Sequence, residues 1–119
     1  MIALSNGILA LTLDDHARLI SFENLKTGKG NIIARPRPIF RCVLQNGENW
    51  EDMAYAEKAE MTTVVSGDTA TIQVSALNTR MGRQNIELTL TIRLEGEKAF
   101  FNAVIHNHSQ VTVNDFYFP

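Results

Sequence analysis

Hydrophobic and polar residues alternate along much of the chain, most clearly between residues 86 and 95. Every second residue from Ile86 to Leu94 is Ile or Leu, and the residues between them are Glu, Thr or Arg. Successive side chains of a β-strand point to opposite faces of its sheet. The pattern therefore predicts a strand with one buried face and one face in solvent.

The same period of two recurs in shorter segments. The residues expected to share a buried face are Leu9, Leu11 and Leu13 in the first segment, Ile20 and Phe22 in the second, and Ala70, Ile72, Val74 and Ala76 in the third. Turn-forming residues separate the segments at Asp14–Ala17, Ser66–Asp68 and Glu95–Glu97. Several short strands joined by such turns predict an all-β fold, an antiparallel β-sandwich of about eight strands.

Three segments depart from simple alternation. Residues 98–107 are apolar on both faces, which favours a central strand covered on both sides. Residues 46–58 read as a loop with one helical turn. The last strand, 111–118, ends in Phe116-Tyr117-Phe118-Pro119. Because chain ends are normally polar, these aromatics indicate the N-terminal portion of a longer protein, or else an edge strand that docks its rings on its own core.

Length and composition are those of one globular domain covering residues 1–119. Hydrophobic residues make up 45% of the chain and charged residues 20%, with a net charge of −2. This balance disfavours a nucleic-acid partner. No apolar stretch approaches the roughly 20 residues of a membrane span, so no membrane partner is expected. The N-terminus lacks the features of a signal peptide, which leaves the cytoplasm as the default location.

The segment around the only Trp is the strongest candidate for ligand binding. It contains Trp50, Glu51, Asp52 and Tyr55, and so combines aromatic rings, which cover the apolar face of a sugar, with carboxylates that bond its hydroxyls. The competing interpretation is that Trp50 packs the segment onto the core. Carbohydrate is therefore the expected ligand of this segment, if it has one.

Catalytic and metal-binding patterns are weaker. His106 and His108 are spaced to share a strand face, but a zinc site needs further ligands. The lone Cys42 lies in an apolar run, which predicts that it is a small, buried hydrophobic residue. We expect no cofactor, no metal and no catalytic residue in this chain.

Paired carboxylates, which glycoside hydrolysis requires, occur at three places. These are Asp14-Asp15, Glu51-Asp52, and Glu95 with Glu97. The first and last pairs fall in predicted turns, where acidic residues serve the backbone.

Two stretches resemble a known domain family. Residues 9–24 match a pattern "L-x-L-x-L-D", a turn and "R-L-x-S-L-x-N", followed by a "T-G" loop at Thr27-Gly28. Residues 86–119 are similar to the family's later strands, the last of which ends in "F-P". The family is the galactose-mutarotase-like β-supersandwich that precedes the (β/α)8 barrel of many glycoside hydrolases. The resemblance implies the first portion of a longer, non-catalytic sandwich, with the catalytic residues on a downstream domain.

Three functions follow as hypotheses. The first is an accessory domain that supports the catalytic barrel of a glycoside hydrolase and contacts carbohydrate. The second is an independent carbohydrate-binding module. The third is a protein-interaction domain that docks a partner, or a second copy, through its C-terminal strand.

Overall fold

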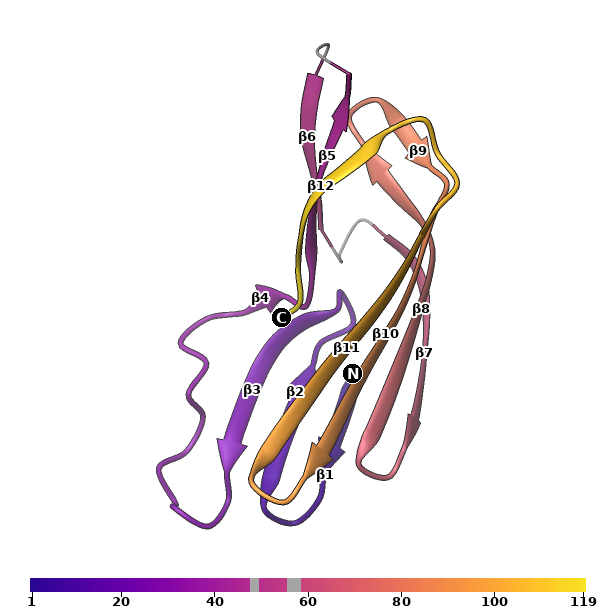
Figure 1. Cartoon of the computed structure of the whole chain (residues 1–119). Helices are drawn as coiled ribbons and strands as arrows, with labels where there is room; N and C mark the ends of the chain where they lie inside the picture. Colours follow the sequence, from indigo (N-terminus) through magenta and orange to yellow (C-terminus); the bar gives the residue numbers. More distant parts are fainter. Residues whose placement is uncertain (48–49, 56–58) are drawn as a thin grey trace.

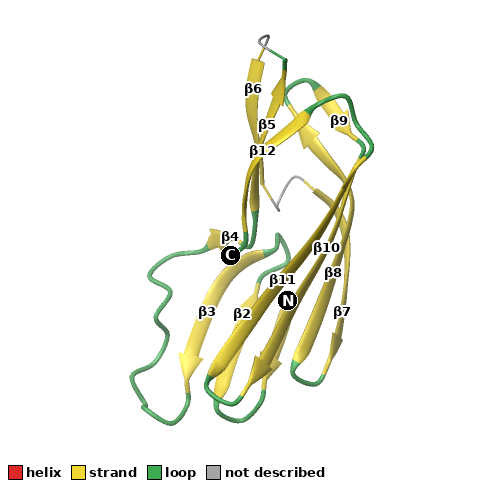
Figure 2. Cartoon of the chain, in the orientation of Figure 1, coloured by secondary structure: helices red, strands yellow, loops and turns green. Residues whose placement is uncertain are grey.

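The computed structural model describes residues 1–47, 50–55 and 59–119, and for residues 50–52 and 55 it describes the backbone alone. The described residues form twelve strands and no helix (Figures 1 and 2). The all-β antiparallel prediction is confirmed, although the number of strands exceeds the expected eight.

The strands form three antiparallel sheets. Sheet A has the order β1-β2-β3-β4, sheet B the order β12-β5-β6, and sheet C the order β11-β10-β8-β7, with β9 paired to β8. The strands of sheet A are β1 (Ile2–Ser5), β2 (Leu9–Leu13), β3 (Arg18–Asn24) and β4 (Arg37–Pro38). Those of sheet B are β5 (Arg41–Asn46), β6 (Trp50–Tyr55) and β12 (Thr112–Tyr117). Those of sheet C are β7 (Ala59–Ser66), β8 (Thr69–Thr79), β9 (Gly82–Gln84), β10 (Ile86–Glu95) and β11 (Lys98–Asn107).

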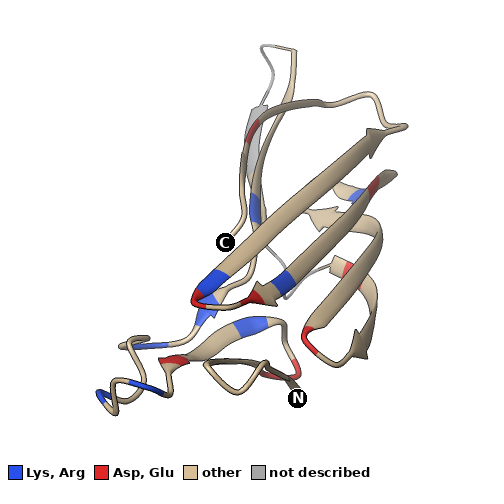
Figure 3. Ribbon diagram, turned by 60° about the horizontal axis from the view of Figure 1, so that its bottom comes forward, with Lys and Arg blue, Asp and Glu red and all other residues tan. Residues whose placement is uncertain are grey.

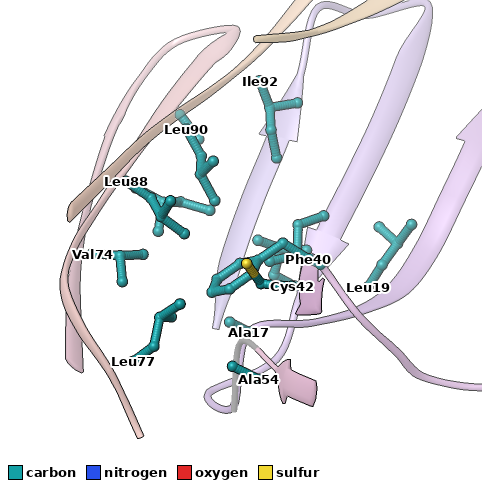
Figure 4. Packing of buried hydrophobic residues seen from close by; sticks show 14 of the residues in the cluster. Ala17, Leu19, Phe40, Cys42, Ala54, Val74, Leu77, Leu88, Leu90 and Ile92 are labelled. Carbon is teal, nitrogen blue, oxygen red and sulfur yellow. The ribbon is translucent and has the colours of Figure 1, made fainter. Parts of the chain in front are cut away.

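The core lies between sheets A and C, where both sheets contribute the faces that the alternation predicts. Every apolar residue of β10 from Ile86 to Leu94 is buried, as are Leu9, Leu11 and Leu13 of β2. Figure 4 shows Leu88, Leu90 and Ile92 of β10 pointing toward the side chains of sheets A and B. The three predicted hairpin turns also join the strands that they were expected to join.

A bulge in β3 changes which of its residues face the core. Leu13 pairs with Leu19 while Thr12 pairs with Ser21, so Ile20 has no opposite residue. The extra residue reverses the alternation, and Leu19 is buried together with the inward-facing Phe22. The expectation that Ile20 and Phe22 share a face is therefore wrong.

Residues 46–58 do not form the expected loop with a helical turn. Strand β6 pairs with β5 in continuous register from Arg41↔Tyr55 to Asn46↔Trp50. Gly47 lies in the turn with φ +56°, a conformation that glycine adopts freely. Hydrogen bonding to β5 outweighs the weak local preference for helix in this stretch.

Strand β11 is an edge strand of sheet C and not a central one. Its only paired neighbour among the described strands is β10. The outer side chains of Phe100 and Val104 are 42% and 44% exposed. The prediction of a strand covered on both sides is therefore wrong. The sequence shows that the outer face of β11 is apolar, but it does not show whether another element covers that face.

The C-terminal aromatics dock on the chain's own core. The ring of Phe116 stacks on Phe40 with centroids 5.9 Å apart, and Phe118 meets the edge of Phe101 at 5.3 Å. The exposed Tyr117 lies beneath the guanidinium of Arg41, whose central carbon is 4.4 Å from the ring centroid. Docking on the core describes the packing of Phe116 and Phe118, and the expectation of a longer protein stays a prediction.

Candidate binding face

The four residues predicted to contact carbohydrate cannot be placed as a site. Trp50, Glu51, Asp52 and Tyr55 all belong to β6, but their side chains lie outside the described part of the structure. Backbone pairing alone shows that they lie on an outer strand of sheet B, next to β5. Their role in binding stays a prediction.

The carboxylate pairs in the turns are engaged locally. Asp15 pairs with the N-terminal ammonium, Glu95 with Arg93, and Glu97 lies 3.7 Å from the Lys26 ammonium. Asp14 accepts hydrogen bonds from the backbone N–H groups of His16 and Arg18, each at 2.9 Å, and from Arg18 Nε at 2.7 Å. Among these residues, Asp14 holds the backbone of its turn, while Asp15, Glu95 and Glu97 form ion pairs at the surface.

The Asp14 carboxylate makes the β2–β3 turn sensitive to acid. Partial desolvation acts to raise the pKa of Asp14, but hydrogen bonds from Arg18 and His16 and the Arg18 charge outweigh it and lower the pKa. A carboxylate with a depressed pKa stabilises the fold above the pKa of the unfolded chain, near pH 4, and loses this effect as the pH falls through the folded value. The turn should therefore weaken in acid.

We expect Asp14→Ala to lower the free energy of unfolding by about 1–2 kcal/mol at pH 7, because two backbone donors and a guanidinium lose their acceptor. The difference from the unmodified chain should shrink at pH 3, where its own Asp14 becomes protonated. Urea unfolding at both pH values measures this, with Glu23→Ala on the neighbouring strand β3 as the control. An equal difference at both pH values would contradict the role of the charge.

His106 and His108 do lie together, but without a third ligand. Their rings are nearly parallel, with centroids 6.3 Å apart, and His108 Nε2 is 3.6 Å from the Glu87 carboxylate. Within residues 1–47, 50–55 and 59–119, no three His, Cys, Asp or Glu side chains are grouped to hold a metal ion. Cys42 is fully buried, and desolvation raises the pKa of its thiol to about 11, so it lacks the thiolate character of a nucleophile.

A hollow of about 500 Å³ lies on the outer face of sheet C, the face turned away from the core. Strands β7, β8 and β10 form its walls. The outward-pointing residues that line it are Glu60, Thr62, Gln73, Ser75, Glu87 and Thr89. Strand pairing places Thr62 opposite Gln73, Gln73 opposite Thr89, and Thr89 opposite Val104, so one row of side chains crosses the whole sheet.

A second bulge shapes this hollow. Glu60 pairs with Ala76 while Met61 pairs with Val74, which leaves Ser75 without an opposite residue on β7. The Ser75 hydroxyl donates to the backbone carbonyl of Glu60 at 3.2 Å. Bulges bend a strand and redirect its side chains, and here the bend lies at the wall of the hollow.

Hydrogen bonds fix the polar groups of the hollow. The Thr89 hydroxyl donates to Gln73 Oε1 at 3.0 Å, which leaves the Gln73 amide N–H groups as donors for a ligand. At the rim, Arg83 Nε donates to Glu60 Oε2 at 2.8 Å, and Glu87 faces His108. The site therefore offers hydroxyls, an oriented amide and two carboxylates.

The centre of this face carries no charge. In Figure 3 the middle stretches of the sheet C strands are uncharged, and the acidic and basic residues lie toward the strand ends. Thr62, Gln73 and Thr89 thus present neutral polar groups, with carboxylates at the rim. Such a surface suits a neutral ligand rich in hydroxyl groups, which both donates and accepts hydrogen bonds.

Comparison with protein-family models, with curated proteins and with solved structures finds no match to this chain. The fold defines the class of protein, an antiparallel β-sandwich. No helix in the described part of the chain is long and apolar enough to cross a membrane.

Proposed function

We propose that this chain is a non-catalytic β-sandwich domain that binds carbohydrate in the hollow of sheet C and acts as an accessory to a glycoside hydrolase domain. The observation that supports carbohydrate binding is the hollow itself, about 500 Å³ and lined by hydroxyls, an amide and rim carboxylates. The accessory role comes from the resemblance of residues 9–24 and 86–119 to the galactose-mutarotase-like family. The hydrolase domain would be the partner that supplies catalysis.

Each group in the hollow has a use in binding a saccharide. The free N–H groups of Gln73 donate to sugar oxygens, while the carboxylates of Glu60 and Glu87 accept from sugar hydroxyls. Because the site is an open hollow, we expect weak binding, with Kd values on the order of 0.1–1 mM.

The carboxylates support binding more than catalysis. Glycoside hydrolysis needs an acid and a base that flank the scissile bond inside a site that orients the sugar. Glu60 and Glu87 instead lie at an open rim, and each already faces a cationic or ionisable partner, Arg83 or His108. We therefore propose that the chain alone does not turn over glycosides.

The test is an NMR titration of the full chain with neutral oligosaccharides of glucose, galactose, mannose and xylose. We expect shifts of backbone amides in β7, β8 and β10, and a loss of affinity of tenfold or more in Gln73→Ala. Thr89→Val, which removes the hydroxyl that orients Gln73, should weaken binding several-fold. The matched control is Thr12→Val, the same change on the outer face of sheet A.

The outcomes separate the candidate sites. Loss of binding in Trp50→Ala, with Gln73→Ala unaffected, would move the site to the β5–β6 hairpin. Absence of binding to every oligosaccharide at 10 mM ligand would overturn the proposed carbohydrate binding. Robust turnover of aryl glycosides by the chain alone would overturn the proposal that the domain is non-catalytic.

A further inference from the structure

Strand β11 leaves one long edge of sheet C unpaired within the described residues. Its turn to β10 is a two-residue hairpin closed by Glu95 and Lys98. In such a hairpin the closing pair exchanges hydrogen bonds, and hydrogen-bonded pairs then alternate along the ladder. The even-numbered residues of β11 therefore bond to β10, while Ala99, Phe101, Ala103 and Ile105 direct their backbone N–H and C=O groups outward.

This edge lacks the features that normally prevent edge-to-edge pairing. Proteins protect exposed edges with charges, bulges, proline or very short strands. Strand β12 has a register shift and carries Asp115, β7 carries Glu60 opposite the bulge of β8, and β1 and β4 are 4 and 2 residues long. By contrast, β11 is 10 residues long, continuous in register, and has no Lys, Arg, Asp or Glu from Ala99 to Asn107.

The sequence of β11 is complementary to itself. Two antiparallel copies can form one continuous sheet when outer residues lie opposite outer residues, so a twofold axis must pass through a single residue position. With the axis at Asn102, Phe100 of each copy lies opposite Val104 of the other. On the inner face, Phe101 then lies opposite Ala103, and Ala99 opposite Ile105, so a small residue always meets a larger one.

The pairs made in this register are favourable. Aromatic and β-branched residues directly opposite each other stabilise antiparallel sheets. The exposed side chain of Phe100 in each copy would cover Val104 of the other copy, so the dimer contains this contact twice. A shift that moves the axis to Ala103 would instead place Phe100 opposite His106 and Val104 opposite Asn102, which loses both pairs.

We propose that two copies of this chain associate through β11, antiparallel and with the twofold axis at Asn102, to form one continuous sheet across both copies. About eight new backbone hydrogen bonds join the two strands. Because the axis is perpendicular to the sheet, the outer faces of both copies lie on the same side of the dimer. Two of the C-terminal aromatics, for which the sequence suggested this role, contact the same chain instead, Phe116 against Phe40 and Phe118 against Phe101.

Analytical ultracentrifugation of the full chain between 5 µM and 500 µM tests the association. We expect a concentration-dependent dimer whose Kd rises at least tenfold in Val104→Lys and in Phe100→Glu. The matched control is Val64→Lys, the same change at an exposed valine on the opposite edge strand of the sheet, which should leave the Kd unchanged. Circular dichroism melts confirm that each variant is folded.

The double variant Phe100→Glu/Val104→Lys tests the register. With the axis at Asn102, each Glu lies opposite a Lys, so dimerisation should return and become sensitive to salt. A monomer at 500 µM for the unmodified chain would overturn the proposal. A dimer weakened equally by Val64→Lys would overturn the choice of strand, and failure of the double variant to restore pairing would overturn the register. Since the measurement uses no saccharide, its result is independent of the proposed binding site.

Discussion

Leu90→Ala is expected to lower the free energy of unfolding by about 3–5 kcal/mol. Leu90 is fully buried on β10, which pairs on both sides with β8 and β11. Truncation removes apolar contacts and leaves a cavity that paired strands on both sides cannot close. Since a domain of this size is stable by about 5–15 kcal/mol, the variant should be folded but close to its unfolding transition. Urea unfolding followed by circular dichroism measures the change.

Phe101→Ala is the comparison for this prediction. A central strand covered on both sides, as the sequence predicts for residues 98–107, would bury Phe101 as fully as Leu90, but Phe101 is only partly buried because β11 is an edge strand. Its loss should therefore be clearly smaller than that of Leu90→Ala. Equal losses at the two positions would mean that β11 is covered in solution, as the proposed dimer would cover it at high protein concentration.

Phe40→Ala should be equally damaging, at about 3–5 kcal/mol. Phe40 is 1% exposed, and its ring stacks on Phe116 of β12. In Figure 4 it lies near Cys42 and between the residues of sheet C and those of sheet A. Removing the ring opens a cavity where the three sheets meet and releases Phe116.

Chemical denaturation of Phe40→Ala monitored at several wavelengths measures the loss, with Phe116→Ala for comparison. Because Phe116 is only partly buried, its truncation should cost less. A change below about 1 kcal/mol in Phe40→Ala would show that the three sheets do not depend on this residue.

Strands β8 and β10 of sheet C could be predicted because their local pattern and their environment agree. In β10 each buried Ile or Leu alternates with a polar residue, and Gly67 and Gly96 mark the turns. Where one face is buried and the other wet, the period of two specifies the strand without information from elsewhere in the chain.

The failures occur where distant partners decide the structure. The β5–β6 hairpin depends on pairing that outweighs the weak local signal of residues 46–58. The bulge at Ile20 is fixed by the register between β2 and β3. The sequence predicts β11 as a central strand because the composition of a strand does not show which strands lie beside it. These properties belong to pairs of segments and not to single segments.

The candidate site escaped prediction for the same reason. Thr62, Gln73 and Thr89 are unremarkable polar residues on the wet faces of three strands. They form one row only through the registers of two strand pairs, and the bulge at Ser75 shapes the wall beside them. The only signal in the sequence was the run of uncharged polar residues on alternate positions of β8, from Thr69 to Ser75.

The pairing of β12 with β5 has a consequence for synthesis of the protein on the ribosome. Strands β7, β8, β10 and β11 pair with near neighbours in the chain, so sheet C can form while translation proceeds. Strand β5 emerges early but cannot pair with β12 until the end of the chain has been made. Cys42 of β5 and its partner Phe116 of β12 are separated by most of the sequence. During that interval one edge of β5 is unpaired and the ring of Phe40 lacks its cover. The nascent chain therefore completes its core only when residues 112–117 have left the exit tunnel.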